Sequence, residues 1–175
     1  MNRMLQAVLL SSALAVVAQP SPYTDRVNLP VKALSEDAMK AYRDGTGMGL
    51  AIPAELNGYP GPRHLLDMAG HLELTDAQKA SLQAIFDPMH DDAVRLGGEI
   101  IDLERKLDEV FARGTASDDE VRTLTREIAS RQGQLRFVHL KAHIATKKVL
   151  NADQIAMYEK MRGYMGEHGG EHTHH

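Results

Sequence analysis

The chain has 175 residues, the length of one small domain, and 43% of them are hydrophobic while 25% are charged. It contains no tryptophan and only three phenylalanines, which excludes a thick aromatic core and favours thin helical packing by small and flexible side chains. The formal net charge of −4 argues against a nucleic-acid partner, because binding nucleic acid requires a concentrated basic face.

Residues 1–18 have the pattern of a secretory signal peptide. Arg3 is followed by an apolar run over residues 4–18, which ends at Ala18 just before Pro20. A positive start, an apolar core and small residues before the cleavage site are typical of export signals. The alternative is an uncleaved N-terminal anchor, because the run is only slightly shorter than the ~20 residues that span a bilayer. We therefore expect an exported protein, and one without disulfides because it has no cysteine.

Residues 19–61 form an extended lead-in with short helices. Ser35 is a good N-cap for a short helix, and the glycine-rich run 44–49 ends it. This run could suggest a phosphate-binding loop, but it lacks the Gly-Lys-Ser/Thr ending of such loops. Residues 50–57 predict one or two further helical turns, which the prolines and glycines after Gly58 stop.

Residues 62–165 form the main domain, with a short helix over 62–72 followed by a long helical hairpin. The first hairpin helix begins at Thr75, whose hydroxyl can accept a hydrogen bond from the backbone of Gln78 while the Gln78 side chain returns one. This reciprocal arrangement, a capping box, is predicted again at two later helix starts, namely Ser117 with Glu120 and Asn151 with Gln154.

Apolar residues recur at alternating spacings of three and four along two long segments, as in a coiled coil. On the first segment they are Leu82, Phe86, Met89, Ala93, Leu96, Ile100, Leu103, Leu107 and Val110, and on the second Val121, Leu124, Ile128, Leu135, Val138, Ala142, Ala145 and Val149. Arg131 interrupts the second series. Because only a short loop around Gly114 separates the segments, we predict an all-α fold: a long antiparallel hairpin with short flanking helices.

A second set of apolar residues lies off the seam of this hairpin. Two paired helices bury only one stripe each, so these side chains need cover from the short helices, a second copy of the chain or a client protein. The set, which we expect to be a client-binding surface, consists of Ile101, Phe111, Phe137, Leu140 and Ile144.

Two similar pentapeptides bracket the hairpin, the first containing Leu74, Thr75 and Gln78 and the second Leu150, Asn151 and Gln154. Behind an export signal, this pair resembles the repeated Leu-Thr-x-x-Gln motif of the Spy/CpxP superfamily, with Asn replacing Thr in the second copy. The stretch 54–62 before it looks like the lead-in of the heavy-metal sensor and resistance branch of that superfamily. The resemblance implies a periplasmic helical protein that forms a cradle-like homodimer from intertwined hairpins.

The superfamily includes ATP-independent chaperones, envelope-stress regulators, zinc-binding chaperone-regulators and membrane-anchored metal sensors. The resemblance therefore implies an accessory protein that binds unfolded or envelope proteins and is modulated by a divalent heavy metal. One alternative is a heavy-metal sensor that regulates a membrane signalling or anti-sigma partner, and another is a purely structural helical dimer. No arrangement of Ser, His and Asp or of Cys and His suggests catalysis, so we do not expect an enzyme.

The histidines are the candidate metal ligands. His139 and His143 are four residues apart on the return helix, so both rings can project from one face and share a Zn²⁺, Ni²⁺ or Co²⁺ ion. In an antiparallel hairpin centred near Thr115, His90 lies roughly opposite His139, and His64 of the short helix is another candidate. The alternative is a pair of ordinary surface histidines. In either case the fold itself requires no metal.

Residues 166–175 are predicted to be a disordered, histidine-rich tail. Imidazoles on a flexible segment bind divalent metals without a preformed geometry. A purification tag is the alternative, but the Gly, Glu and Thr interruptions are typical of a native sequence. The candidate ligands in the tail are His168, His172, His174 and His175.

Overall fold

The structure, a computed structural model, describes residues 19–164 and is all-helical over that range. After a 3₁₀ turn at Thr24–Arg26, the helices are α1 (Glu36–Arg43), α2 (Ile52–Glu55), α3 (Pro62–Asp67), α4 (Asp76–Ala112), α5 (Asp118–Lys147) and α6 (Ala152–Met161). None of the helices between residues 19 and 164 is both long enough and apolar enough to span a bilayer. The predicted signal peptide (1–18) and histidine-rich tail (166–175) lie outside the described residues.

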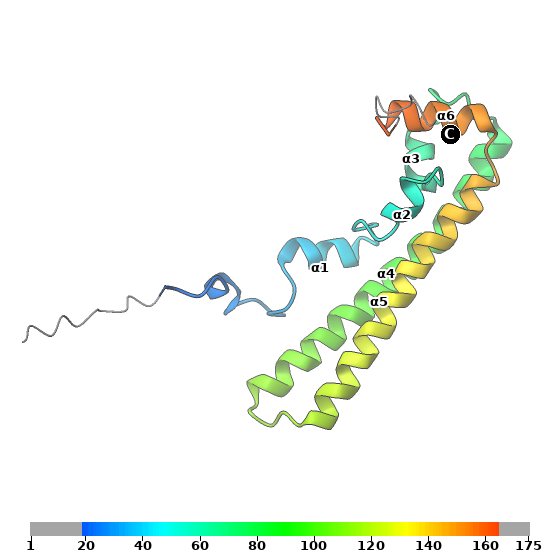
Figure 1. Ribbon diagram of the computed structural model, residues 1–175. Helices are drawn as coiled ribbons and strands as arrows, with labels where there is room; N and C mark the ends of the chain where they lie inside the picture. Colours follow the sequence, from blue (N-terminus) through cyan, green and yellow to red (C-terminus); the bar gives the residue numbers. More distant parts are fainter. Residues whose placement is uncertain (1–18, 165–175) are drawn as a thin grey trace, which may run out of the picture.

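The two long helices α4 and α5 form the predicted hairpin and lie side by side along their length (Figure 1). The chain reverses at Gly114, whose φ of 68° places it in the left-handed region that glycine adopts without strain. Seam residues predicted from the spacing, among them Ala93, Leu96 and Ile100 of α4 and Leu135 of α5, form one buried cluster. The all-α hairpin is therefore confirmed.

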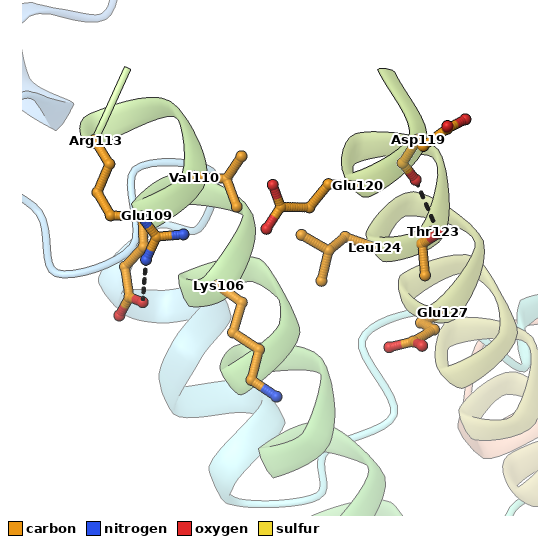
Figure 2. A pocket seen from close by; sticks show the side chains of 9 residues that line it. All are labelled: Lys106, Glu109, Val110, Arg113, Asp119, Glu120, Thr123, Leu124 and Glu127. Carbon is orange, nitrogen blue, oxygen red and sulfur yellow. Dashed lines mark hydrogen bonds and ion pairs between the residues drawn. The ribbon is translucent and has the colours of Figure 1, made fainter. Parts of the chain in front are cut away.

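The helix starts follow the predicted capping chemistry with one exception. Both capping boxes that involve a glutamine are present, at Thr75 for α4 and at Asn151 for α6. At α5 the Ser117 hydroxyl accepts from the backbone N–H of Glu120 at 3.3 Å, but the Glu120 side chain returns no bond. The prediction of a full box there is wrong, because the Glu120 carboxylate points across the hairpin toward α4 (Figure 2).

The lead-in covers one flank of the hairpin near the middle of α4. Helix α1 packs on α4, and Val31 and Met39 pack on Ile101, which is 3% exposed. Gly97 makes this approach possible: a Cβ atom at its position would lie 2.2 Å from the carbonyl oxygen of Tyr42. The contact fixes the C-terminal end of α1 against α4.

Helix α6 crosses the end of the hairpin opposite its turn, which we call the base, near α3 (Figure 1). Tyr158 of α6 is 1% exposed and belongs to a buried cluster with Leu65, Leu72, Leu74 and Leu82. Helix α3 ends at Asp67 rather than at the predicted residue 72. The chain passes instead through turns at Gly70 and at Glu73, whose φ of 48° is incompatible with a continuing helix.

Candidate functional site

The structure brings four of the sequence-predicted histidines to one pocket of about 400 Å³. His64 comes from α3, His90 from α4, and His139 and His143 from α5. The glycine-rich turn 44–47 also lines this pocket, so the pocket lies between the lead-in and both hairpin helices. We call it the histidine pocket.

His139 is the most enclosed of the four, with only 5% of its surface exposed. It is therefore not an ordinary surface histidine, which was the alternative interpretation of the sequence. Its Nε2 is buried and has no hydrogen-bond partner among the described residues. Burial lowers the pKa of His139, and the nearby His143 and His90 lower it further. The ring is therefore held in the neutral form, which is the form that binds metals.

His143 has a fixed ring orientation. Its Nδ1 lies 2.6 Å from the carbonyl oxygen of Tyr59, which can only accept, so Nδ1 carries the proton and donates it. The lone pair is then on Nε2, where it is available to a ligand. Gly61 packs so closely on the ring that a Cβ at residue 61 would lie 3.0 Å from Cε1 and Nε2. A backbone carbonyl in this role is a common support for metal-binding histidines.

The other two histidines are less constrained. The His90 ring stacks on Phe86 with centroids 5.3 Å apart, and the space beside its Nδ1 is kept open by Gly45. His64 is exposed, at the rim of the pocket. Both side chains can therefore move further than His139 and His143 can.

The four imidazoles fit a divalent transition metal in type but not in their present placement. Nitrogen ligands of this kind suit Zn²⁺, Ni²⁺ and Co²⁺. However, among residues 19–164 no three His, Asp or Glu side chains are grouped closely enough to hold one ion. A metal ion in the histidine pocket would therefore need its ligands to lie closer together than they do here. The predicted ligands His168, His172, His174 and His175 lie outside the described residues.

The residues predicted to form a client-binding surface differ in exposure. Phe111, Phe137 and Ile144 are 58%, 63% and 50% exposed, and Leu140 is half-buried. The prediction is wrong for Ile101, because the lead-in covers it. Phe137 lines a largely apolar pocket of about 350 Å³ between α4 and α5, on which no residue of the lead-in lies.

A second cleft of about 450 Å³ lies near the hairpin turn, where the ends of α4 and α5 diverge (Figure 2). Val110 and Leu124 face each other across it, and six charged residues surround them. These are Lys106, Glu109, Arg113, Asp119, Glu120 and Glu127. No pattern in the sequence predicted this cleft, because its apolar residues continue the ordinary seam.

The two motif glutamines have a further role that sequence reasoning missed. Besides capping their own helices, Gln78 and Gln154 hydrogen-bond to each other, and Gln78 Nε2 also donates to the Val149 carbonyl at 3.0 Å. Leu74 is buried, and Leu150 packs on the cluster around Tyr158. The motif residues thus join the helix starts of α4 and α6 at the base of the hairpin.

Sequence reasoning also missed a polar network next to the histidine pocket. It centres on Glu55 of α2, which contacts His143, Tyr158 and Tyr164. The one feature of the sequence that pointed to this region was the resemblance of the lead-in stretch 54–62 to the heavy-metal branch.

Comparison of the chain with protein-family models, with curated proteins and with solved structures gives no match. The likeness to the Spy/CpxP superfamily therefore depends on the two pentapeptides and the hairpin between them.

Proposed function

We propose that this chain is a periplasmic Spy/CpxP-like accessory protein, an ATP-independent chaperone or stress-response protein whose activity is modulated by a divalent heavy metal. The observation that carries the metal part of the proposal is the histidine pocket, where side chains from three helices meet. A buried imidazole nitrogen without a partner, on His139, favours a ligand at this position. His143 supports it, because its tautomer leaves Nε2 free.

The exposed apolar residues of the hairpin support the chaperone part. Phe137 and Ile144 lie seven residues apart on α5, which is two helical turns, and are both at least half exposed. Phe137 adjoins an apolar pocket that could receive a side chain of a client. Lysine and arginine residues nearby, such as Lys141, keep this face soluble and would speed encounters with acidic segments.

Calorimetric titration with ZnCl₂ tests the metal site. The full chain is compared with a chain that lacks residues 166–175 and with His139→Ala in each background. We expect one site that survives the deletion and is lost in His139→Ala. If the deletion removes all zinc binding, the histidine pocket is not a metal site.

A light-scattering assay of an aggregating client tests the chaperone activity, with and without ZnCl₂. We expect suppression at stoichiometric protein that is weakened in Phe137→Ser and unaffected by Ser130→Ala, a substitution at an exposed α5 position. Absence of suppression by the wild-type protein would remove the chaperone from the proposal.

A heavy-metal sensor that controls a membrane regulator is the second candidate. It is favoured by the glycine-rich turn 44–47 in the wall of the histidine pocket, because a metal there would tie the lead-in to the hairpin. This candidate predicts that the same titration gives tight stoichiometric binding in a protein that does not suppress aggregation. If His139→Ala still suppresses aggregation of the client and zinc does not change that suppression, the result would argue against the sensor.

A further inference from the structure

Glu55 is a nearly buried carboxylate that receives contacts from three parts of the chain. Its side chain is 12% exposed. Oε1 accepts hydrogen bonds from the hydroxyl of Tyr158 and from that of Tyr164, the latter at 3.1 Å. Oε2 accepts from the backbone N–H of Gly61 at 3.2 Å. A buried carboxylate needs such partners, since burial without them is costly.

The same carboxylate lies next to His143 of the histidine pocket. Oε2 of Glu55 lies 3.7 Å from Nδ1 of His143, the nitrogen that donates to the Tyr59 carbonyl. A negative charge at this distance favours the proton on Nδ1 and so favours the lone pair on Nε2. Glu55 therefore supports the metal-binding tautomer of His143 from behind.

On its other side, Glu55 contacts α6 and the residues that follow it. Tyr158 belongs to α6, and Tyr164 follows that helix. Arg162 also contacts both Glu55 and Tyr164, since its Nε lies 3.7 Å from Glu55 Oε1 and its guanidinium donates to the Tyr164 hydroxyl at 2.9 Å. The carboxylate is thus held in part by α6 and the residues that follow it.

We propose that Glu55 is a positioning residue that couples the histidine pocket to α6, because one carboxylate both orients His143 and anchors Tyr158 and Tyr164. A cation bound at Nε2 of His143 would make Nδ1–H a stronger donor and would strengthen its attraction to Glu55. Docking of α6 and occupation of the pocket therefore favour each other, and the coupling is reciprocal. The coupling to a cation rests on the metal site proposed above, whereas the orientation of His143 does not.

Nitrogen NMR of histidine in the metal-free full chain tests the orientation. We expect wild-type His143 to be protonated at Nδ1 and Glu55→Gln to increase the Nε2-protonated form. Tyr164→Phe, which keeps the carboxylate but removes one anchor, should shift the same signals in a smaller degree. Glu109→Gln, an exposed carboxylate on α4, is the matched control and should leave them unchanged. Unchanged His143 signals in both Glu55→Gln and Tyr164→Phe would overturn the coupling.

Zinc titration and hydrogen exchange of the same proteins test the other half. We expect zinc to slow amide exchange in α6 of the wild type, and Glu55→Gln to lose that effect and about tenfold in zinc affinity. Equal affinity in Glu55→Gln, or no zinc effect on wild-type α6, would overturn the coupling to the cation. If wild-type zinc binding is insensitive to His139→Ala, the metal function fails, and the nitrogen signals alone decide whether Glu55 positions His143.

Discussion

The side-chain amides of Gln78 and Gln154 hydrogen-bond to each other in both directions, with N–O distances of 2.8 and 3.1 Å. Each amide oxygen also accepts from the backbone N–H of the residue that caps its own helix, Thr75 or Asn151. The pair therefore joins the starts of α4 and α6 through two capping boxes. This arrangement gives the repeated pentapeptide a structural purpose beyond each single helix.

Removing either glutamine should destabilise the fold. Gln78→Ala and Gln154→Ala each lose a cap bond and the hydrogen bonds between the two amides, so we expect each to cost about 1–2 kcal/mol in the free energy of unfolding. Because both changes remove the same pair, the double variant should cost less than their sum. Urea denaturation followed by circular dichroism measures this. Gln83→Ala, at an exposed α4 position, is the control and should be close to neutral; additive single effects would show that the pair contributes nothing.

The two adjacent glycines of α4 should respond oppositely to alanine. A Cβ at Gly97 would lie 2.2 Å from the Tyr42 carbonyl, so Gly97→Ala must push α1 away and should cost about 1–3 kcal/mol. A Cβ at Gly98 meets nothing within 4 Å, and alanine favours the helix, so Gly98→Ala should stabilise by up to about 1 kcal/mol. Melting temperatures of the two variants would test this. A stable Gly97→Ala would mean that α1 does not pack on α4 as described.

His139 should make the metal-free protein less stable at low pH. Burial lowers the pKa of the folded state below that of the unfolded chain, which is about 6.5. As pH falls below that value, the unfolded state binds a proton that the folded state does not, so the free energy of unfolding decreases. The decrease continues down to the folded-state pKa.

In His139→Leu this dependence should shrink, as measured by urea denaturation in EDTA at pH 7.5 and pH 5. His71, an exposed histidine outside the histidine pocket, provides the control substitution His71→Leu. A wild-type pH dependence that persists in His139→Leu would assign it to other groups.

Arg131 occupies a seam position of α5, and its Nε lies 2.5 Å from Glu99 Oε2 of α4 as an ion pair without good hydrogen-bond alignment. Both side chains are more than a third exposed, so the ion pair contributes little to the free energy of unfolding. Replacing Arg131 by leucine continues the apolar seam between Ile128 and Leu135. We expect Arg131→Leu to change the free energy of unfolding by less than about 1 kcal/mol or to increase it. A large loss in urea denaturation would show that the ion pair matters more than the seam.

The parts of the fold that depend on nearby residues could be predicted from the sequence. The three-four spacing predicted the hairpin, and Thr75 with Gln78 predicted a helix start, because both patterns depend on residues a few positions apart. The register of the hairpin placed His90 near His139. Ile101 was assigned to the surface because nothing in its own helix shows that Val31 and Met39 cover it. The Glu55 network was missed for the same reason, since Tyr158 lies 103 residues away from it.

Glu120 shows a different limit of sequence reasoning. Ser and Glu at the correct spacing permit a capping box, but the glutamate side chain has a competing position that only the partner helix determines. At the divergent end of the hairpin it lies toward Val110 instead (Figure 2). A local motif therefore predicts where a helix begins better than it predicts where its side chains lie.

The distance in sequence between Gln78 and Gln154 sets an expected order of assembly. Contacts beside Gly114 close small loops, whereas the glutamine pair closes one of 76 residues, which costs more chain entropy. We therefore expect the middle of the hairpin, where Leu96 and Leu135 pack, to pair before its base closes, with α6 joining last. Unfolding should run in reverse, so the base would open while the middle of the hairpin remains paired.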